Sequence, residues 1–379
     1  MPLTTTEQAI QLLESSRQPL IVFKKDFSGD ALGAALALAL VFEKRHAEPT
    51  VVCADFKLPE KYRFLPTTTR VLSQLSSAKK FTISLPLGGK QIEEFSYDVV
   101  DDELKIFITP KEGAFGEKDI IVVPPHWDYD VIITLDTPNL DSLGALYAEH
   151  RDLFYEKPIV NIDASPANEQ YGQINLIDLM AASTGGVVYE LLKAWGDYDL
   201  DADINTCLLT GMVEKTKGFK TGLINPQTLR NASELIEKDA RRDDVIRHLY
   251  YDRDVATLKL WGGILTRLSA TAGNKIISAT VTLEDFKTTN TATKNLPDVI
   301  DELISTVPGV EVIVVCYEKE HNKIGVLIKS LGTFDPTRHF STHQPQGTKL
   351  LCKFVIDGND LALAESTIVE DVAKAIAVS

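Results

Sequence analysis

Residues 19–45 read PLIVFKKDFSGDALGAALALALVFEKR, and this stretch decides the fold class. Its first five residues, Pro19 to Phe23, form a compact apolar run of the kind found in buried strands. Residues Asp26 to Gly29 then predict a turn, and the apolar residues from Ala31 to Arg45 predict a long helix. A strand, a polar loop and a helix in this order are the repeating unit of an α/β domain.

The same unit recurs along the first half of the chain. Because the strands are continuously apolar, they predict a doubly wound parallel sheet, on which ligands bind at the carboxyl ends of the strands. Those ends carry the residues from Lys24 to Asp30, then Asp136 and Asp163. The further strands are predicted at 50–53, 130–135 and 158–162, and the further helices at 67–76, 142–150 and 183–195.

Three segments break this rhythm: an insertion in the first domain, a helical linker and a second domain. Residues 80–123 hold short alternating runs separated by Gly-Gly and Asp-Asp turns, which indicates an antiparallel β insertion. Asn225 and Pro226 are an N-cap and first-turn pair that opens a helical linker over 226–268. Strands return over 269–379 and predict a smaller α/β domain, which follows a first domain over 1–225.

The composition restricts the classes of function. The 379 residues are 44% hydrophobic and 25% charged, which is typical of a globular protein and excludes bulk disorder. A formal net charge of -15 disfavours a protein that binds long nucleic acid, but it leaves room for a small phosphorylated ligand. The four cysteines are widely spaced, and neither a signal peptide nor a membrane-spanning run is visible. We therefore expect free thiols, a cytoplasmic location and no membrane partner.

Four strand-end sequences, found in order along the chain, resemble the four motifs of the DHH phosphoesterase family. The nearest branch is that of the exopolyphosphatase-like and oligoribonuclease/phosphoadenosine-phosphate phosphatase proteins, and residues from about 270 onward resemble the DHH-associated C-terminal domain. The resemblance implies carboxylates and imidazoles that hold two Mn²⁺ or Mg²⁺ ions for phosphoester hydrolysis. The sequences are IVFKKDFSGDALGAALAL (21–38), IITLDTPNLDSLG (132–144), IVNIDASPANEQYGQINLID (159–178) with AASTGGVVYELL (181–192), and LLTGMVEKTKGF (208–219).

The first two motifs keep only part of the implied metal ligands. Asp30 and Asp136 occupy positions at which the family has ligand carboxylates. Lys24 stands where the family has a histidine, and Ser28 stands where it has its first aspartate. A lysine is protonated at neutral pH and cannot bind a cation.

The last two motifs have lost further ligands. Asp163 is kept, but Ala164 and Ser165 replace the two histidines that give the family its name. Lys215 replaces the aspartate of the fourth motif, and Glu214, one residue away, would point to the other side of a strand end. The resemblance thus implies a vestigial metal site built on three carboxylates, at which we expect no metal.

A few other positions could contact a phosphate or another ligand. In the first domain they are Asn168, Ser183 and Thr184, with a glycine pair after Thr184 that could either cradle a phosphate or allow close helix packing. In the second domain, Lys329 and Ser330 align with the family's substrate-holding strand, where Lys329 replaces an arginine and keeps its charge.

Two of the lost ligand positions became lysine, and this suggests a hypothesis. Three clustered carboxylates repel one another unless a cation compensates them. Lys24 and Lys215 could supply the charge that two metal ions supply in the enzymes. The alternative is that both are solvated loop residues without a partner.

Three functions remain open. The first is a catalytically inactive DHH homologue that binds a nucleotide, a short oligonucleotide or a protein. The second is an active phosphoesterase with an altered site, in which Asp30, Asp136 and Asp163 surround one Mn²⁺ or Mg²⁺ ion. The third is a purely structural subunit that dimerises through the α/β domain and uses the β insertion, Lys80 to Val123, as its contact surface.

Overall fold

The computed structural model describes residues 3–75, 80–196, 200–222, 224–252, 255–302, 307–320 and 322–378. The chain divides into two compact units, Met1–Asp252 and Arg253–Ser379. Within the described ranges, no helix is both long enough and apolar enough to cross a bilayer.

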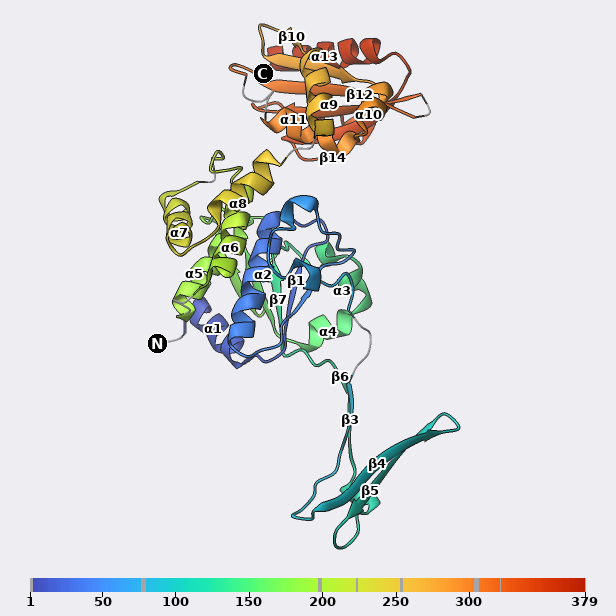
Figure 1. The fold of residues 1–379 in the computed structure, drawn as a ribbon. Helices are drawn as coiled ribbons and strands as arrows, with labels where there is room; N and C mark the ends of the chain where they lie inside the picture. Colours follow the sequence, from blue (N-terminus) through green and yellow to red (C-terminus); the bar gives the residue numbers. More distant parts are fainter. Residues whose placement is uncertain are drawn as a thin grey trace. The chain divides into compact units, whose positions relative to one another are not determined.

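The first unit contains a five-stranded parallel sheet in the order β2-β1-β7-β8-β9 (Figure 1). Side chains alternate between the two faces of this sheet. Ile21 and Phe23 pack under α2, α5 and α6, whereas Leu20 and Val22 pack against α3 and α4. Helices on both faces confirm the predicted doubly wound α/β fold. The strands are β1 (Pro19–Phe23), β2 (Thr50–Val52), β7 (Val131–Leu135), β8 (Ile159–Asp163) and β9 (Ile174–Ile177), and the helices are α1 (Thr5–Ser15), α2 (Gly29–Lys44), α3 (Ala145–Glu149), α4 (Arg151–Glu156), α5 (Thr184–Trp195), α6 (Ala202–Lys215), α7 (Pro226–Glu237) and α8 (Arg242–Ile246).

Helix α2 is buried nearly all round because its residues are small and apolar. The side chain of Ser28 caps its start by accepting a hydrogen bond from the Ala31 amide. Helix α6 packs so closely on α2 that a Cβ atom at Gly33 would lie 2.3 Å from the carbonyl oxygen of Cys207. Gly33 therefore fixes how near the two helices can come.

The predicted β insertion is present as two separate two-stranded antiparallel sheets. Strands β4 and β5 form a hairpin whose turn residues, Asp101 and Asp102, both have left-handed backbone angles. This is the geometry of the tight turns that match the twist of a hairpin. The strands are β3 (Lys80–Ser84), β4 (Ile92–Val100), β5 (Glu103–Pro110) and β6 (Ile121–His126).

Two predicted elements of the first unit are wrong. Residues 67–76 were expected to be helical, but only a short 3₁₀ turn forms at Thr68–Arg70. Leu72 instead exchanges backbone hydrogen bonds with β2 and its extension, accepting from Cys53 and donating to Val51. Residue 76 itself lies outside the described ranges. The fourth motif was expected at a strand end, but it forms the last turn of α6.

The segment 226–268, predicted as a helical linker, begins as the sequence indicates. Asn225 caps α7 by accepting a hydrogen bond from the Thr228 amide, and Pro226 occupies the first turn. The division between the two units falls inside this segment. Helices α7 and α8 lie in the first unit and α9 lies in the second.

The second unit holds a six-stranded mixed sheet in the order β10-β11-β12-β13-β15-β14. Two hydrophobic clusters cover its two faces, one under α9, α10 and α11 and the other under α13. The strands are β10 (Ser269–Thr271), β11 (Ile276–Val281), β12 (Val312–Lys319), β13 (Lys323–Ser330), β14 (Gln346–Gly347) and β15 (Leu351–Asp357), and the helices are α9 (Val255–Leu265), α10 (Leu283–Thr289), α11 (Leu296–Glu302), α12 (Pro336–His339) and α13 (Leu361–Val378).

Candidate functional site

The candidate site lies where the strand order of the parallel sheet reverses. The chain passes from β1 outward to β2 and later returns beside β1 as β7. Ligands of open α/β sheets bind at such a reversal, beyond the carboxyl ends of the strands. Lys24 directly follows β1 and Asp136 directly follows β7, so both residues lie at this point.

Asp136 is the centre of a cluster of polar side chains. Its Oδ2 atom lies 2.7 Å from Nζ of Lys24 and accepts a hydrogen bond from the Ser28 hydroxyl at 3.1 Å. Its Oδ1 atom lies 3.5 Å from Nζ of Lys215. The Asp136 side chain is 3% exposed, whereas those of Lys24 and Lys215 are 25% and 33% exposed. Both carboxylate oxygens of Asp136 therefore face ammonium groups, and neither lysine is a solvated residue without a partner.

The backbone at Asp136 is unusual for a residue with a side chain. Its φ angle is +47°, in the left-handed region that most L residues avoid. Aspartate tolerates this conformation better than most residues, and strained backbone of this kind gathers at functional sites. The turn directs the chain out of β7 while the carboxylate stays within reach of both lysines.

Asp30 is fully buried in the first turn of α2, and backbone amides hold its carboxylate. The amides of Thr184 and Gly185, at the start of α5, donate to its two oxygens at 2.8 Å each. Burial raises the pKa of Asp30 from 3.8 to about 6, and the charge of Lys215 opposes this shift. The amino end of α5 is thus occupied by a carboxylate from this chain.

Two glycines allow this contact. Close packing was one of two roles that the sequence left open for Gly185, whereas the role of Gly211 was not identified. A Cβ atom at Gly211 of α6 would lie 2.8 Å from Oδ1 of Asp30, and one at Gly185 would lie 3.1 Å from the same oxygen. Any side chain at Gly211 would displace either Asp30 or α6. The available signal was the presence of glycine inside apolar helical sequence, which marks a close approach.

Asp163 ends β8 and bonds mainly to its own loop. Its Oδ1 accepts hydrogen bonds from the amides of Ala164 and Ser165 at 2.7 and 3.1 Å. Its Oδ2 accepts from Nδ2 of Asn168 at 2.8 Å. Asn168 therefore orients a carboxylate and the loop around it.

Lys215 connects the three carboxylates electrostatically. Burial acts to lower the pKa of its ammonium group, but Asp136, Asp30 and Asp163 together raise that pKa above its ordinary value. The lysine is therefore held in its charged form. Its position at the end of α6 also places a positive charge near the negative end of a helix dipole.

Glu214 faces a different set of partners, which the sequence did not predict. Its carboxylate accepts hydrogen bonds from the Lys61 ammonium at 2.6 Å and from the Tyr62 hydroxyl. A Cβ atom at Gly29 would lie 2.2 Å from Oε2 of Glu214, so any side chain there would displace the Glu214 carboxylate. Burial, followed by the charge of Glu214, raises the pKa of Tyr62. The segment around Tyr62 has no motif that could have revealed this contact.

The remaining predicted ligand contacts lie at the start of α5 or in the second unit. The Ser183 hydroxyl caps α5 by accepting a hydrogen bond from the Gly186 amide at 3.0 Å, and the Thr184 amide is bound to Asp30. The Thr184 hydroxyl is buried with no hydrogen-bond partner among the described residues. Lys329 and Ser330 lie on β13 of the second unit, where the Ser330 hydroxyl is 3.5 Å from the carbonyl oxygen of Gly332.

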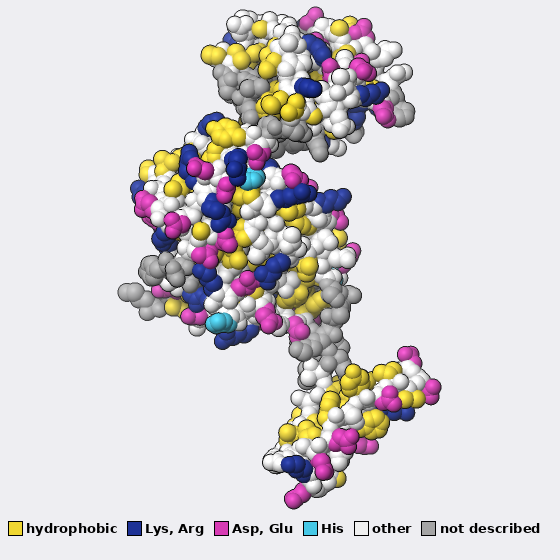
Figure 2. All heavy atoms as spheres, viewed as in Figure 1, with side chains coloured by type: hydrophobic (Ala, Val, Ile, Leu, Met, Phe, Trp, Pro, Cys, Tyr) yellow, Lys and Arg dark blue, Asp and Glu magenta, His cyan; other side chains and the backbone are white. Residues whose placement is uncertain are grey.

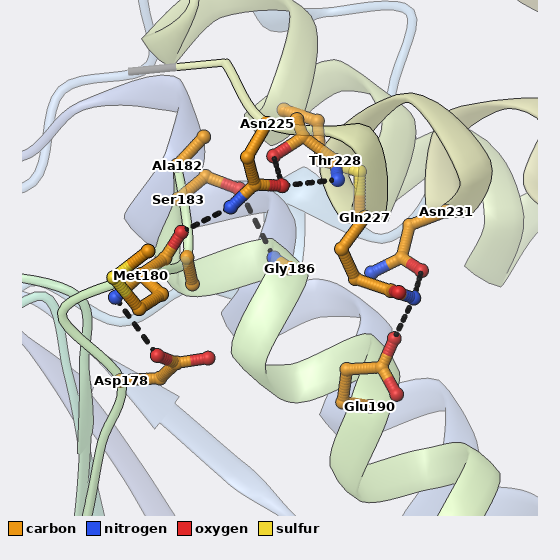
Figure 3. Close-up of a pocket in the computed structure, with 12 residues that line it drawn as sticks. Asp178, Met180, Ala182, Ser183, Gly186, Glu190, Asn225, Gln227, Thr228 and Asn231 are labelled. Carbon is orange, nitrogen blue, oxygen red and sulfur yellow. Dashed lines mark hydrogen bonds between the residues drawn. The ribbon is translucent and has the colours of Figure 1, made fainter.

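A small pocket of about 190 Å³ borders the start of α5 (Figure 3). Its polar side chains bond to one another. Asn225 donates to the Met180 carbonyl oxygen at 2.6 Å, and Gln227 donates to Glu190 at 3.0 Å and to Asn231 at 2.8 Å. Pockets that enclose a whole small-molecule ligand usually measure about 300–1,000 Å³. The pocket is a side recess of the region rather than a complete ligand site.

The residues of the cluster do not fit a two-metal centre. Metal ions of this kind need free carboxylate oxygens and neutral imidazoles. Here the oxygens of Asp136 face lysines, those of Asp30 face backbone amides, and those of Asp163 face its own loop. Among the residues that the structure describes, no group of three or more His, Cys, Asp or Glu side chains is arranged to hold a metal ion.

Comparisons with known proteins give one relative by sequence and one by fold. No family model matches the chain. The bifunctional oligoribonuclease and PAP phosphatase NrnA of Thermus thermophilus is 25% identical over 190 residues, which cover 50% of this chain and 55% of that protein. The chain therefore spans about half the length of this curated relative. An exopolyphosphatase-related protein from Bacteroides fragilis has the same fold, with a TM-score of 0.72 at 16% identity over 98% of this chain and 95% of that one. Both likenesses support the resemblance to the DHH phosphoesterases that the four motifs predicted.

Proposed function

We propose that this protein is a DHH phosphoesterase homologue without two-metal catalysis, and that it binds the phosphoryl group of a nucleotide or of a short oligonucleotide end. The observation that carries the proposal is the pairing of both Asp136 oxygens with Lys24 and Lys215. The two ammonium groups hold the cluster together where the family's motifs place metal ligands.

The lysines also provide the means of binding. Each ammonium group has three donors, and only part of that capacity is used on Asp136. Both side chains keep about a quarter to a third of their surface exposed, so a phosphate oxygen can approach them. Lysine binds phosphate as a point charge. The name of the relative NrnA, an oligoribonuclease and PAP phosphatase, supports nucleotides as the class of ligand.

The first test concerns metal and catalysis. Metal-stripped protein is titrated with Mn²⁺ in a calorimeter and is then incubated with a 5′-labelled dinucleotide. We expect neither binding of the ion nor cleavage above buffer. Micromolar binding of one ion, with cleavage that Asp136→Asn abolishes, would establish the alternative of an active phosphoesterase whose three carboxylates surround a single Mn²⁺ or Mg²⁺ ion.

The second test concerns the lysines. Replacing Lys24 and Lys215 together with Met leaves Asp136 buried without a cation, so we expect a loss of about 1–3 kcal/mol in the free energy of unfolding. Breaking a fully buried ion pair can cost more stability than this, but both lysines are partly exposed, so we expect the smaller loss. Denaturant unfolding measures the change. Lys105→Met is the matched control, because Lys105 lies 3.9 Å from Glu103 on an exposed hairpin, where an ion pair contributes at most about 1 kcal/mol. Equal stability of the double variant and the wild type would contradict the role of the lysines.

Ligand binding is tested with adenosine 3′,5′-bisphosphate and with a 5′-phosphorylated dinucleotide. We expect each ligand to raise the melting temperature of the wild type, because binding to the folded state alone stabilises it. The single variants Lys24→Met and Lys215→Met should lose that shift, while Lys105→Met should keep it. A shift of the same size in all four proteins would place the ligand elsewhere.

Two further features belong to this proposal. All four cysteines are free and buried, which supports a reducing compartment and so a cytoplasmic location. The exposed hairpin of the β insertion supports the alternative of a protein-binding or dimeric scaffold. A scaffold would fail both the metal and the nucleotide tests.

A further inference from the structure

The hairpin formed by β4 and β5 has one face that is entirely apolar. The register pairs Phe95 with Ile108, Tyr97 with Ile106 and Val99 with Leu104, and residues paired directly share a face. The opposite face carries the pairs Glu94 with Thr109, Ser96 with Phe107, Asp98 with Lys105 and Val100 with Glu103. The hairpin is therefore amphipathic, and its apolar side chains are Phe95, Tyr97, Val99, Leu104, Ile106 and Ile108.

This apolar face has no cover among the described residues. Phe95, Tyr97, Val99 and Leu104 are 62–70% exposed, and Ile106 is 42% exposed. None of the six residues belongs to a hydrophobic cluster of the described chain. Figure 2 shows the hydrophobic side chains gathered over β4 and β5. A two-stranded hairpin is marginally stable in water by itself, and an exposed apolar face of this kind marks a surface that binds a partner.

Charge excludes two classes of partner. Between residues 92 and 110, the only basic side chain is that of Lys105. A hairpin of this charge is repelled by nucleic acid and by an anionic membrane surface. Protein segments that bind either of these are rich in Lys and Arg. The partner is therefore a protein surface that is apolar itself. The acidic side chains of the segment are Glu93, Glu94, Asp98, Asp101, Asp102 and Glu103.

We infer that the apolar face of the β4–β5 hairpin packs on the same face of a second copy of this chain. In this dimer the two-fold axis lies between the two hairpins and perpendicular to their strands, so the facing strands of the two copies run in opposite directions. It lays Phe95 over Val99 of the second copy and Ile108 over Leu104 of the second copy. The large ring at one end of the face then meets the smaller side chain at the other end, so the two ribbons keep an even spacing of about 10 Å.

The same packing keeps the charged side chains of the hairpin in water. Face-to-face contact leaves Glu94, Asp98 and Glu103 on the outer surfaces, in water and far from their copies. No charged residue of the hairpin's paired positions enters the contact. The interface is isologous, because each copy offers the same patch.

The small area of the apolar face limits the affinity of the dimer. The three residue pairs span about 17 Å along the strands and two strands across, which is less than the roughly 800 Å² per partner of a standard interface. We therefore expect a dimer that dissociates on dilution, with a dissociation constant on the order of micromolar. This inference does not depend on the proposed phosphoryl site, since the hairpin shares no residue with that site.

Sedimentation velocity of the full chain over about 1–100 µM tests the inference. The wild type should pass from monomer to dimer in that range. Tyr97→Asp places a charge at the centre of the apolar face and should raise the dissociation constant at least about tenfold. Its control is Ser96→Asp, which places the same charge on the opposite face and should leave the constant within about twofold. A wild type that stays monomeric at about 100 µM, or an equal effect of the two variants, would overturn the inference.

A cross-link provides a second readout that does not rely on weakening the protein. The proposed axis brings Ile106 next to Ile106 of the second copy. Since the four native cysteines are buried, a cysteine introduced there is the exposed thiol. Facing backbones about 10 Å apart are too far for a direct disulfide, so a short thiol-specific bismaleimide is used. It should link Ile106→Cys into a covalent dimer and leave Lys105→Cys, on the opposite face, monomeric. The reverse result would overturn the proposed packing.

Discussion

Strands β7 and β4 show two ways in which apolar residues are used in this protein. Strand β7 is apolar or neutral at every position, and all five of its residues are buried between two layers of helices. Strand β4 alternates polar and apolar residues, and all nine of its residues are exposed. The difference teaches that a parallel strand at the centre of a doubly wound sheet must be apolar on both faces, whereas a ribbon with one apolar face requires a partner from outside. Three predictions test this comparison.

The largest effect is expected from one aromatic substitution made in each region. Phe23 is fully buried at the end of β1, so Phe23→Ala should cost about 3–5 kcal/mol in the free energy of unfolding. Phe107 lies on the polar face of the hairpin and is 52% exposed, so Phe107→Ala should cost less than about 0.5 kcal/mol. Denaturant unfolding followed by tryptophan fluorescence measures both changes. Similar losses in the two variants would show that the hairpin is packed as a core strand is.

The next effect concerns pH and the buried carboxyl group of Asp30. The pKa of this group is about 6 in the folded protein, above the ordinary value of 3.8 that applies to the unfolded chain. Between these values the folded state keeps a proton that the unfolded state has released. The stability that this proton provides is full below about pH 4 and is lost as the pH rises through 6. The loss is about 3 kcal/mol, at about 1.4 kcal/mol per pKa unit.

Unfolding curves at several pH values between 4 and 7 can isolate this contribution. Asp30→Asn has no carboxyl group to titrate, so its stability should fall less steeply over this range than that of the wild type. Parallel pH profiles for the two proteins would contradict the raised pKa of Asp30.

The smallest change in stability is expected from alanine substitutions at two glycines. Gly33→Ala forces a methyl group against the Cys207 carbonyl oxygen, which would lie 2.3 Å away, so α2 and α6 must separate. Overpacking of this kind costs about 1–3 kcal/mol. Gly116→Ala, in the insertion, meets nothing closer than 4.0 Å and should change stability by less than about 0.5 kcal/mol. Thermal unfolding distinguishes the two outcomes, and a Gly33→Ala protein as stable as the wild type would show that the helix pair can yield.

The pattern of residues was sufficient for most of the fold. Continuous apolar strands, the cap at Asn225, and the turns of the insertion are local signals, and the structure contains the elements that they predict. The predicted helix over 67–76 was wrong because its backbone groups pair with the neighbouring strand β2, a contact that local sequence does not encode.

The site was less accessible to sequence reasoning. The motif comparison predicted that Lys24, Asp136 and Lys215 belong to one site. It could not show that both oxygens of the Asp136 carboxylate would face the two lysines. The contact of Asp30 with the amides of α5 depends on how closely α5 and α6 approach α2. Tyr62 and Lys61 reach Glu214 across 152 and 153 residues of sequence, and no spacing rule could pair them.

The pairing of Asp136 with two lysines also constrains how this protein could change. Replacing Lys24 with the family's histidine, or Lys215 with its aspartate, would leave the buried Asp136 short of a cation before any metal could bind. Each of these two substitutions alone should therefore cost stability. The two ammonium groups thus make the site resist stepwise change toward a metal centre.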